Sequence, residues 1–464
     1  MVRPRAAAVA LVSALTFWLI GCGGGTTVPP PPPPPPNSGR PNPTLLTTLY
    51  RFLNGSDRWS TSGESERINY PLEAQTYYVA GQSATGRTAL NRLVNSSGTD
   101  HADAVSDVSG YSQDMLLGYP WTSSVNPAMV QLAEAFNSST GDYALLAPSE
   151  TLPGYAPQPL AAYGYPRYGG LSEVELSLSA GGVTVESNEV AGGAIWRWNW
   201  NGVQFVNHAD YGREIQDAFY FGTGPTNPTE AGDRLQFVDP SLRHGSPIIQ
   251  FQNQATTQVT RAVPLEWDPT LFGGDEDHPV IWDTLVLGKD LELNFNNLGP
   301  VAKYTSHLIL PNASLGLFAM PAGYLNSNFD RYWTYNAQSK TLVEVTSSMP
   351  DGCSTLPNPK GYAFTVNFGG IIMTDAATAN AMGIYGVALS QGGSLSEWDM
   401  WKLFCWGDGP GESAGDNTTW SAVYGHGDDL LFPAGESTYN VYIITDTLQN
   451  VTARMDDLYG LGVR

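Results

Sequence analysis

Residues 192–216 read GGAIWRWNWNGVQFVNHADYGREIQ, and this stretch predicts a β-hairpin. Tryptophans alternate with polar residues from Trp196 to Trp200. The next dipeptide, Asn201-Gly202, has the strongest preference for a two-residue hairpin turn. The pairs expected across such a turn are Trp200–Val203, Asn199–Gln204, Trp198–Phe205, Arg197–Val206 and Ile195–His208.

The two faces of this hairpin differ in chemistry. Side chains alternate between the faces of a strand, so the three tryptophans share one face with Val203 and Phe205. All neighbours on that face are apolar, and we therefore expect it to be core rather than a sugar-binding platform. The polar face is the candidate ligand face, and its substrate-binding candidates are Arg197, Asn199 and Gln204, with His208 beside them.

A dense polar run follows the hairpin and combines an imidazole, two carboxylates and a guanidinium within seven residues. Such groups can move protons on a sugar, or neutralise the carboxylate of a uronate. An internal ion pair between Asp210 and Arg213 that fixes the loop is the other interpretation. The first catalytic candidates are His208, Asp210, Arg213 and Glu214.

A second polar segment, LEWDPTLFGGDEDHPVIWDT, covers residues 265–284. Tryptophans beside acids are typical of a sugar subsite, and a carboxylate-rich loop could instead hold a structural Ca²⁺ through oxygen ligands. A solvated turn is a further alternative. The second catalytic candidates are Asp275, Asp277 and His278, and the substrate-binding candidates are Trp267, Trp282 and Asp283. We expect no other cofactor.

The N-terminus predicts export and a membrane anchor. Residues 1–21 join a basic start to an apolar run, which is typical of a signal peptide. The following LIGC resembles the lipobox of bacterial lipoproteins, which implies lipidation of Cys22 and display at the outer membrane or cell surface. Residues 22–44 contain eight consecutive prolines, and we expect a stiff tether of the polyproline II type.

Composition and cysteine count further narrow the possible partners and the fold class of the protein. The formal net charge of −22 at pH 7 argues against nucleic acid and anionic lipid as partners. Contact with the membrane is therefore expected through the lipid alone, and we expect a monomer. Cys353 and Cys405 remain once Cys22 is lipidated, and an exported pair of this kind is expected to form a disulfide. Plentiful Gly, Pro and aromatic residues favour an all-β protein.

Residues 45–170 contain three repeats of about 40 residues, marked by Asn54, Asn95 and Asn137 and by Asp57, Asp100 and Asp142. Three units suit a closed, three-fold, β-trefoil-like arrangement. With Tyr50-Arg51 in the first unit and Asp100-His101 in the second, the region resembles a three-repeat module appended to secreted bacterial hydrolases. That resemblance implies an accessory domain that binds glycan, whereas asparagines and aspartates that merely shape turns are the alternative.

Residues 171–464 read as strand after strand, divided by Gly, Pro and Asn, and predict a large antiparallel β-sandwich. Gly192-Gly193-x-Ile195, Asn201-Gly202 and Asp210-x-Gly212-Arg213 resemble signatures of the galactose-mutarotase-like supersandwich. This fold is shared by sugar epimerases, glycosidases and polysaccharide lyases. The His acid and Glu base familiar from the epimerases have no unique counterpart in the sequence.

The sequence thus favours a carbohydrate-active surface lipoprotein that degrades or modifies an extracellular polysaccharide by acid–base chemistry, as a glycoside hydrolase or a polysaccharide lyase. A non-catalytic glycan-binding or adhesive protein is the alternative, because an aromatic and acidic composition suits it equally. A fold of this kind supports many functions, so the reaction must be argued from the site.

Overall fold

The structure is a computed structural model, and it describes residues 40–62, 70–166, 175–207, 214–222, 226–234, 245–275, 277–348, 362–364, 369–386, 400–406, 417–424 and 430–463. The signal peptide, Cys22, the polyproline run and Cys353 lie outside these ranges, so export, lipidation and the disulfide stay predictions. Within the same ranges, no helix is long and apolar enough to cross a membrane.

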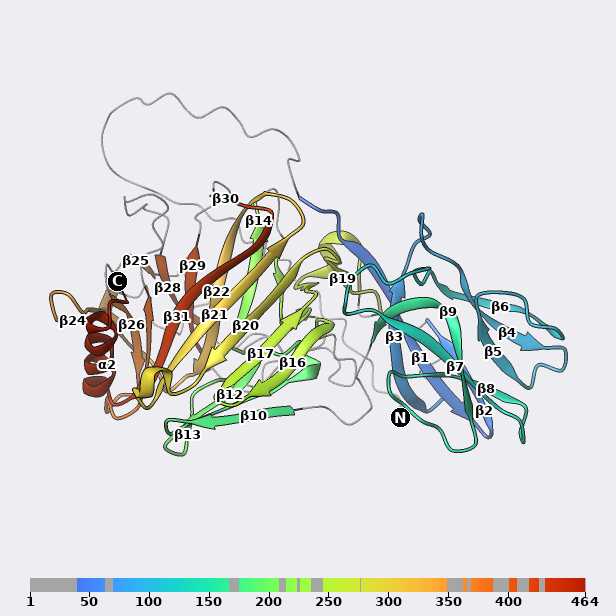
Figure 1. Cartoon of the computed structure of the whole chain (residues 1–464), viewed down its shortest axis with the longest axis horizontal. Helices are drawn as coiled ribbons and strands as arrows, with labels where there is room; N and C mark the ends of the chain where they lie inside the picture. The colour runs from blue at the N-terminus through green and yellow to red at the C-terminus, as the bar shows by residue number, and fades with distance from the viewer. Residues whose placement is uncertain are drawn as a thin grey trace, which may run out of the picture. The chain divides into compact units, whose positions relative to one another are not determined.

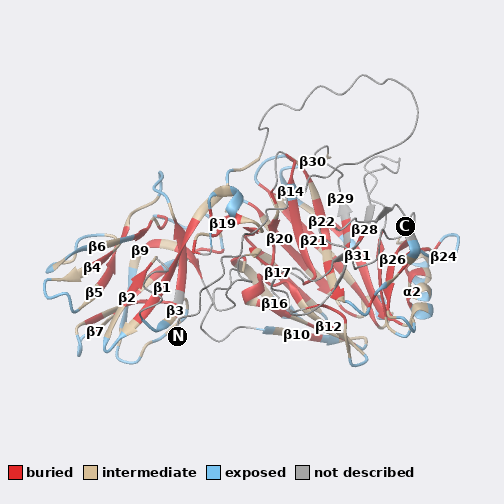
Figure 2. Cartoon of the chain, turned by 180° about the vertical axis from the view of Figure 1, so that it is seen from behind, coloured by how far each residue is buried: buried red, intermediate tan, exposed pale blue. Residues whose placement is uncertain are grey.

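The prediction of an all-β protein is confirmed. The described residues form antiparallel strands joined by short turns, and among them the single α-helix is α2 (Leu448–Gly460). Figure 1 shows the strands and this helix, and Figure 2 shows that buried residues run along most strands. The short 3-10 turns are η1 (Glu189–Ala191), η4 (Pro269–Phe272), η5 (Phe295–Asn297) and η6 (Thr346–Ser348).

The three repeats each form three antiparallel strands, of which the first is central and pairs with both of the others. The repeated asparagine ends the first strand, and the repeated aspartate lies where the second begins. The β-trefoil itself stays a prediction. The strands are β1 (Thr44–Asn54), β2 (Asp57–Thr61), β3 (Leu72–Ala80), β4 (Leu90–Asn95), β5 (His101–Ala104), β6 (Tyr111–Gly118), β7 (Val130–Asn137), β8 (Asp142–Leu146) and β9 (Ala156–Pro166).

The sandwich contains a sheet of nine described strands, in the order β16-β17-β20-β21-β31-β27-β26-β23-β24. Helix α2 packs on β26, β27 and β31, where it buries Val451, Met455 and Leu458. The bounds are β16 (Ile248–Gln254), β17 (Thr257–Ala262), β20 (Val286–Glu292), β21 (Val301–Leu310), β31 (Gly435–Asp446), β27 (Ala381–Gly386), β26 (Gly369–Thr374), β23 (Arg331–Asn336) and β24 (Thr341–Glu344).

A second large sheet runs in the order β25-β28-β29-β22-β14 and continues through the short strands β15, β18 and β19. Strand β19 pairs with β1, so this sheet extends into the repeats. A small sheet carries the predicted hairpin in the order β10-β11-β12-β13. The remaining bounds are β25 (Tyr362–Phe364), β28 (Met400–Trp406), β29 (Asn417–Tyr424), β22 (Ser314–Asn326), β14 (Gln216–Phe221), β15 (Pro228–Thr229), β18 (Leu265–Glu266), β19 (Val280–Ile281), β30 (Leu430–Phe432), β10 (Glu175–Ala180), β11 (Val183–Asn188), β12 (Ile195–Trp200) and β13 (Val203–Gln204).

The hairpin prediction is confirmed near its turn and wrong further out. Trp200 pairs with Val203 and Asn199 with Gln204, and the Phe205 amide donates to the Trp198 carbonyl. Further out, the structure has the bridges Val206–Leu325 and Ile195–Ile215 in place of the predicted partners of Val206 and Ile195. His208 lies outside the described residues.

The expectation of a tryptophan core holds for Trp198 and is corrected for Trp196. Trp198 is fully buried in the main core of the sandwich, and Trp200 packs against that core. In the pairing of β11 with β12, Glu186 faces Arg197 while Ser187 faces Ile195, so Trp196 is the extra residue of a β-bulge. The bulge reverses the alternation, and the Trp196 indole instead donates to Glu175 at 3.0 Å.

The Gly-Gly pair before the hairpin is required by a close backbone approach. Gly192 has a φ of 60°, and a Cβ added to it would lie 1.8 Å from the carbonyl oxygen of Glu230. A side chain at this position would therefore separate the hairpin from the loop that carries Glu230.

Candidate functional site

The polar side chains of the hairpin bind residues of the hairpin itself and of the neighbouring strand β11. Arg197 donates to Glu186 at 2.8 Å and lies over the Trp196 ring. The Gln204 side chain accepts from the Trp198 amide and donates to the Val206 carbonyl, both at 3.1 Å. These two candidates stabilise the hairpin, and Asn199 lies half-buried opposite Gln204.

Of the first catalytic candidates, His208, Asp210 and Arg213 lie outside the described residues. Glu214 precedes β14 and is fully buried. A carboxyl group without exposed surface has no direct access to a substrate in solution.

In the acidic loop near residue 275, Asp275 and His278 form an exposed turn, whereas Asp277 is buried. The Asp275 side chain is 65% exposed and contacts His278 Nδ1 at 2.6 Å, and the two residues also exchange backbone hydrogen bonds. Asp277 is buried and accepts from the Tyr50 hydroxyl at 2.6 Å, while its carbonyl accepts from the Thr48 amide. Asp277 thus joins the sandwich to β1 of the repeats. Glu276 lies outside the described residues, so a Ca²⁺ in this loop stays a prediction.

Trp282 and Asp283, which follow this loop, also hold structural contacts. Trp282 is fully buried, stacks on Phe221 with ring centroids 4.6 Å apart, and donates to Glu266 at 3.1 Å. Burial raises the pKa of Glu266 to about 7. Asp283 accepts from the Thr44 hydroxyl at 3.1 Å, and burial raises its pKa. Trp282 therefore has no ring surface to offer a sugar, and Trp267 is half-buried.

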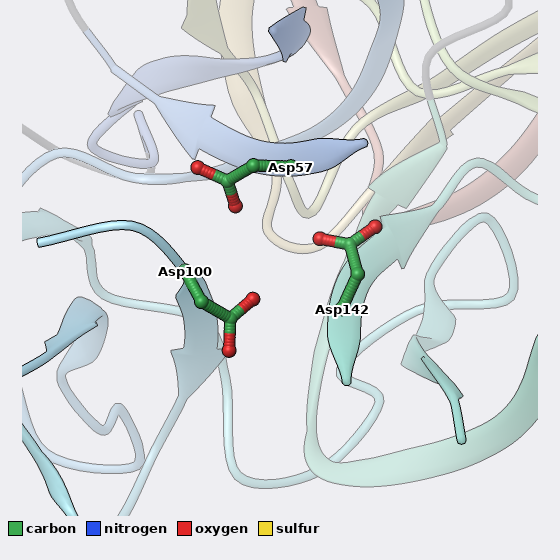
Figure 3. Close-up of side chains that lie close together, drawn as sticks. All are labelled: Asp57, Asp100 and Asp142. Atoms are coloured by element: carbon green, nitrogen blue, oxygen red, sulfur yellow. The ribbon is translucent and has the colours of Figure 1, made fainter. Parts of the chain in front are cut away.

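The three repeats bring one aspartate each to a common point. Asp57, Asp100 and Asp142 each place one carboxylate oxygen within 4.8 Å of the others, and Figure 3 shows the three side chains pointing toward one another. We call them the aspartate triad. Such carboxylates could bind a cation such as Ca²⁺ or the hydroxyls of a sugar. Among the described residues, this is the group of acids and histidines close enough together to hold a metal.

Each member of the triad has a partner from the repeats. His101 Nδ1 lies 2.8 Å from Asp57, the Tyr111 hydroxyl donates to Asp100, and the Tyr155 hydroxyl donates to Asp142. Burial raises the pKa of Asp100 and of Asp142, although the tyrosine hydrogen bonds oppose this. The negative charges are therefore only partly balanced.

The repeats differ at the position three residues before the repeated asparagine. Arg51 binds Glu150 through two hydrogen bonds of 2.7 and 2.8 Å, and Arg92 binds Asp114 at 2.6 Å. The third repeat has Glu134 there, which accepts from the Asp103 amide at 2.8 Å. Burial, together with the charge of Asp103, raises the pKa of Glu134 to about 8. The three repeats are therefore not three equivalent binding sites.

Another group of polar side chains, which the sequence patterns did not single out, lies on the nine-stranded sheet. His307 on β21 places Nδ1 2.6 Å from Oε1 of Glu436 on β31. Its Nε2 lies 3.4 Å from Oδ2 of Asp290 on β20, which is long for a hydrogen bond. Figure 1 shows β20, β21 and β31 side by side. We call His307, Glu436, Asp290 and Arg261 the histidine site.

This site opens to solvent. Side chains alternate along β21, so His307 points away from the core residue Leu308 that follows it. The side chains of Asp290 and Glu436 are 39% and 52% exposed, whereas that of His307 is 10% exposed. The imidazole is thus enclosed by carboxylates that water and a ligand can reach.

A glycine makes room for the cation of this site. A Cβ on Gly288 of β20 would lie 2.6 Å from Cδ of Arg261 and 2.3 Å from the Thr260 carbonyl oxygen. The Arg261 side chain therefore lies where a side chain on β20 would stand. Its guanidinium donates to Asp290 Oδ1 and to the Lys289 carbonyl, both at 2.9 Å.

The charges of the histidine site keep Asp290 ionised. Burial alone would raise the pKa of Asp290, but the neighbouring His307 and the charge of Arg261 outweigh it. The net pKa of Asp290 is therefore lowered.

Sequence reasoning missed this site because its residues come from four strands. Asp290, His307 and Glu436 each stand alone among ordinary strand residues. Gly288 in an otherwise regular strand was the one local signal, because a glycine inside a strand often marks a close approach.

The chain was compared with known proteins by sequence and by structure. No protein-family model and no curated protein sequence matches it. Solved structures that are similar include a galactose mutarotase-like protein from Clostridium acetobutylicum, with 10% identity and a TM-score of 0.34, over 59% of this chain and 95% of that one. A putative aldose 1-epimerase from Klebsiella pneumoniae gives 10% identity and a TM-score of 0.35, over 63% and 84%.

A third similar structure is the GalM/aldose epimerase homologue from C. elegans, with 9% identity and a TM-score of 0.35, over 59% of this chain and 98% of that one. At such TM-scores the likeness assigns neither an activity nor a substrate to this chain. The function must therefore be argued from the side chains of the site itself.

Proposed function

We propose that the chain is an exported, lipid-anchored surface protein whose sandwich modifies a carbohydrate by acid–base chemistry at the histidine site. The observation that supports this proposal is the His307 imidazole, held 2.6 Å from Glu436 on a solvent-open face of the sheet. An imidazole and a carboxylate side by side are the groups that a general acid and a general base require.

The roles follow from the contacts. His307 in its protonated form donates a proton to a sugar oxygen, and Glu436 in its ionised form removes one. Asp290 lies 3.4 Å from the imidazole, and Arg261 fixes Asp290 through a hydrogen bond of 2.9 Å.

Neutral polar groups beside the site suit a sugar. Thr305 and Asn440 are directly opposite each other in the next row of the same face, and their side chains are hydrogen-bonded at 2.8 Å. This pair is solvent-exposed, so hydroxyl groups of a sugar can replace or extend its hydrogen bond. The export signal and the proline tether of the sequence would place such a site outside the cell.

A second candidate function is glycan binding by the repeats without turnover. The observation that favours it is the convergence of the aspartate triad with the hydroxyls of Tyr111 and Tyr155. Carboxylates accept hydrogen bonds from sugar hydroxyls, and aromatic rings beside them can stack on the apolar face of a sugar.

The test is a screen of the full chain against neutral and acidic polysaccharides and free sugars. Anomeric exchange by NMR, new reducing ends and unsaturated products together cover epimerisation, hydrolysis and elimination. We expect turnover that falls about 100-fold or more in kcat in His307→Asn and in Glu436→Gln, which is the usual contribution of a general acid or base.

The matched control is His278→Asn, because His278 also lies 2.6 Å from a carboxylate but in an exposed turn. It should keep full activity. Turnover that survives in both site variants would exclude the proposed chemistry. Glycan binding without turnover, abolished by Asp57→Asn, would instead identify the second candidate.

A further inference from the structure

The inner face of the same strands carries a second, closed group of charges. Lys289, Glu230 and Asp217, which we call the inner cluster, are all 0% exposed. The Lys289 ammonium donates to the Gly193 carbonyl at 2.8 Å and lies 3.2 Å from Glu230 Oε2. The Asp217 amide donates to the same carboxylate at 2.8 Å. The cluster thus joins β14, β20, the Gly-Gly segment and the loop of Glu230.

Hydroxyl groups complete the surroundings of the Asp217 carboxyl. The Ser306 hydroxyl donates to Asp217 Oδ1 at 2.9 Å. Tyr304, two residues earlier on β21, is also fully buried and close to Asp217, and burial together with the charge of Asp217 raises its pKa. The Tyr304 hydroxyl therefore stays neutral and adds no charge.

The charges of the inner cluster do not balance if both acids are ionised. One ammonium faces two carboxyl groups, and an uncompensated charge in a fully buried site is costly. Glu230 lies within 3.3 Å of the Lys289 ammonium through both oxygens, whereas Asp217 receives a direct hydrogen bond from a neutral hydroxyl. Among the described residues, Asp217 is therefore the member that best accommodates a proton.

We propose that Asp217 keeps a proton in the folded protein, and that this proton makes the sandwich more stable at acidic than at alkaline pH. The inner cluster lies on the opposite face of β20 and β21 from the histidine site, so this proposal does not depend on the proposed function. Binding and release of one proton at Asp217 would make the stability of the fold sensitive to pH.

The electrostatic surroundings of Asp217 also favour its protonated form. Burial raises the pKa of Asp217 well above its usual range, and the charge of Glu230 raises it further. Lys289, Ser306 and Tyr304 act in the opposite direction without cancelling the effect. Arg261, on the other face of the sheet, lowers the pKa of Tyr304 through its charge, but burial outweighs it.

The sign of the effect follows from linkage. An aspartate in the unfolded chain releases its proton near pH 4, and the folded chain holds this one to a higher pH. Folding then takes up a proton in the interval between the two, so stability falls as the pH rises through it. The folding equilibrium constant should fall by up to tenfold for each pH unit.

The experiment measures urea unfolding of the full chain between about pH 5 and pH 9, for the natural chain and for Asp217→Asn. The amide imitates a protonated carboxyl, so we expect the stability of the variant to fall less steeply with pH, by up to one proton, and the variant to be the more stable of the two at alkaline pH. Asp330→Asn, at an exposed acid, is the control and should keep the natural slope. Equal slopes in Asp217→Asn and the natural chain would overturn the proposal.

A second measurement does not depend on the folding of a variant. Infrared spectroscopy of the natural chain at neutral pH should show a carboxylic acid C=O band that shifts in heavy water and disappears on unfolding. Because Asp103, Glu134 and Glu266 also have raised pKa values, the band is assigned by its decrease in Glu134→Gln and Asp217→Asn in turn. No change in the band in Asp217→Asn would show that Asp217 is ionised.

Discussion

The repeats and the sandwich assemble polar sites in different ways. In the repeats, one local motif occurs three times, and each copy contributes one acid to the aspartate triad. In the sandwich, His307 meets Glu436 across 129 positions of sequence because β21 and β31 are neighbours. A repeated site can be recognised from the period of the sequence, whereas a site built across a sheet depends on strand order.

Their buried charges differ as well. Both regions bury charged groups beside an apolar core, but the inner cluster of the sandwich is fully buried, whereas Arg51 of the repeats binds acids that keep some exposed surface. We expect the packing of Trp198 to contribute strongly to the stability of the sandwich, and buried ion pairs to contribute to the stability of the repeats.

The largest effect is expected for Trp198→Ala. Removing a fully buried indole leaves a cavity, and the free energy of unfolding should fall by about 3 to 5 kcal/mol in chemical denaturation. Trp196→Ala, two positions away on the bulge, should cost about 1 kcal/mol or less, because its indole binds an exposed acid. Similar losses in both variants would contradict the bulge.

Arg51→Met is expected to cost about 3 kcal/mol in the same measurement. Its guanidinium is buried against Glu150 and Glu73, and removing it leaves Glu150 without the cation that binds it, whereas Glu73 keeps its pair with Arg58. Arg331→Met, which breaks the exposed pair with Glu344, is the control and should cost much less, because solvent screens an exposed ion pair. If the two variants lose equal stability, the repeats do not depend on buried ion pairs.

The smallest effect is expected for Glu134→Gln and appears as a change in pH dependence. The folded carboxyl has a pKa of about 8, above its ordinary value, so its stabilisation is present in acid and lost as the pH rises through about 8. The natural chain should lose up to about 1.4 kcal/mol per pH unit from this group. The variant should lose less.

The control for Glu134→Gln is Asp107→Asn, an exposed acid in the same region. It should leave the slope of stability against pH unchanged. A slope that Glu134→Gln also leaves unchanged would mean that Glu134 is ionised in the folded chain.

The hairpin shows how far the sequence predicts the fold. The Asn201-Gly202 turn and its nearest pairs are confirmed because a two-residue turn fixes them locally. Ile195 pairs with Ile215, a residue beyond the predicted hairpin, and such a long-range partner cannot be read from the turn. The outward position of Trp196 depends on a bulge, for which the sequence has no local marker.

The second polar segment shows why candidate residues were harder to predict. Acids beside tryptophans look alike in sequence whether they line a cleft or anchor a junction. Asp277 and Trp282 became buried because Tyr50 and Phe221, both far away in sequence, pack against them. The residue types therefore indicated a polar and aromatic segment, but the sequence could not predict that Asp277 and Trp282 are buried.

By itself, the sequence determined the all-β class, the three repeats and the hairpin turn, because these depend on alternation, period and local turn chemistry. The tertiary structure alone decided which polar groups meet: it placed His307 beside Glu436 at the surface and Asp217 beside Lys289 inside. The physical reason is that hydrogen bonds between strands, and not neighbourhood along the chain, set which side chains share a face.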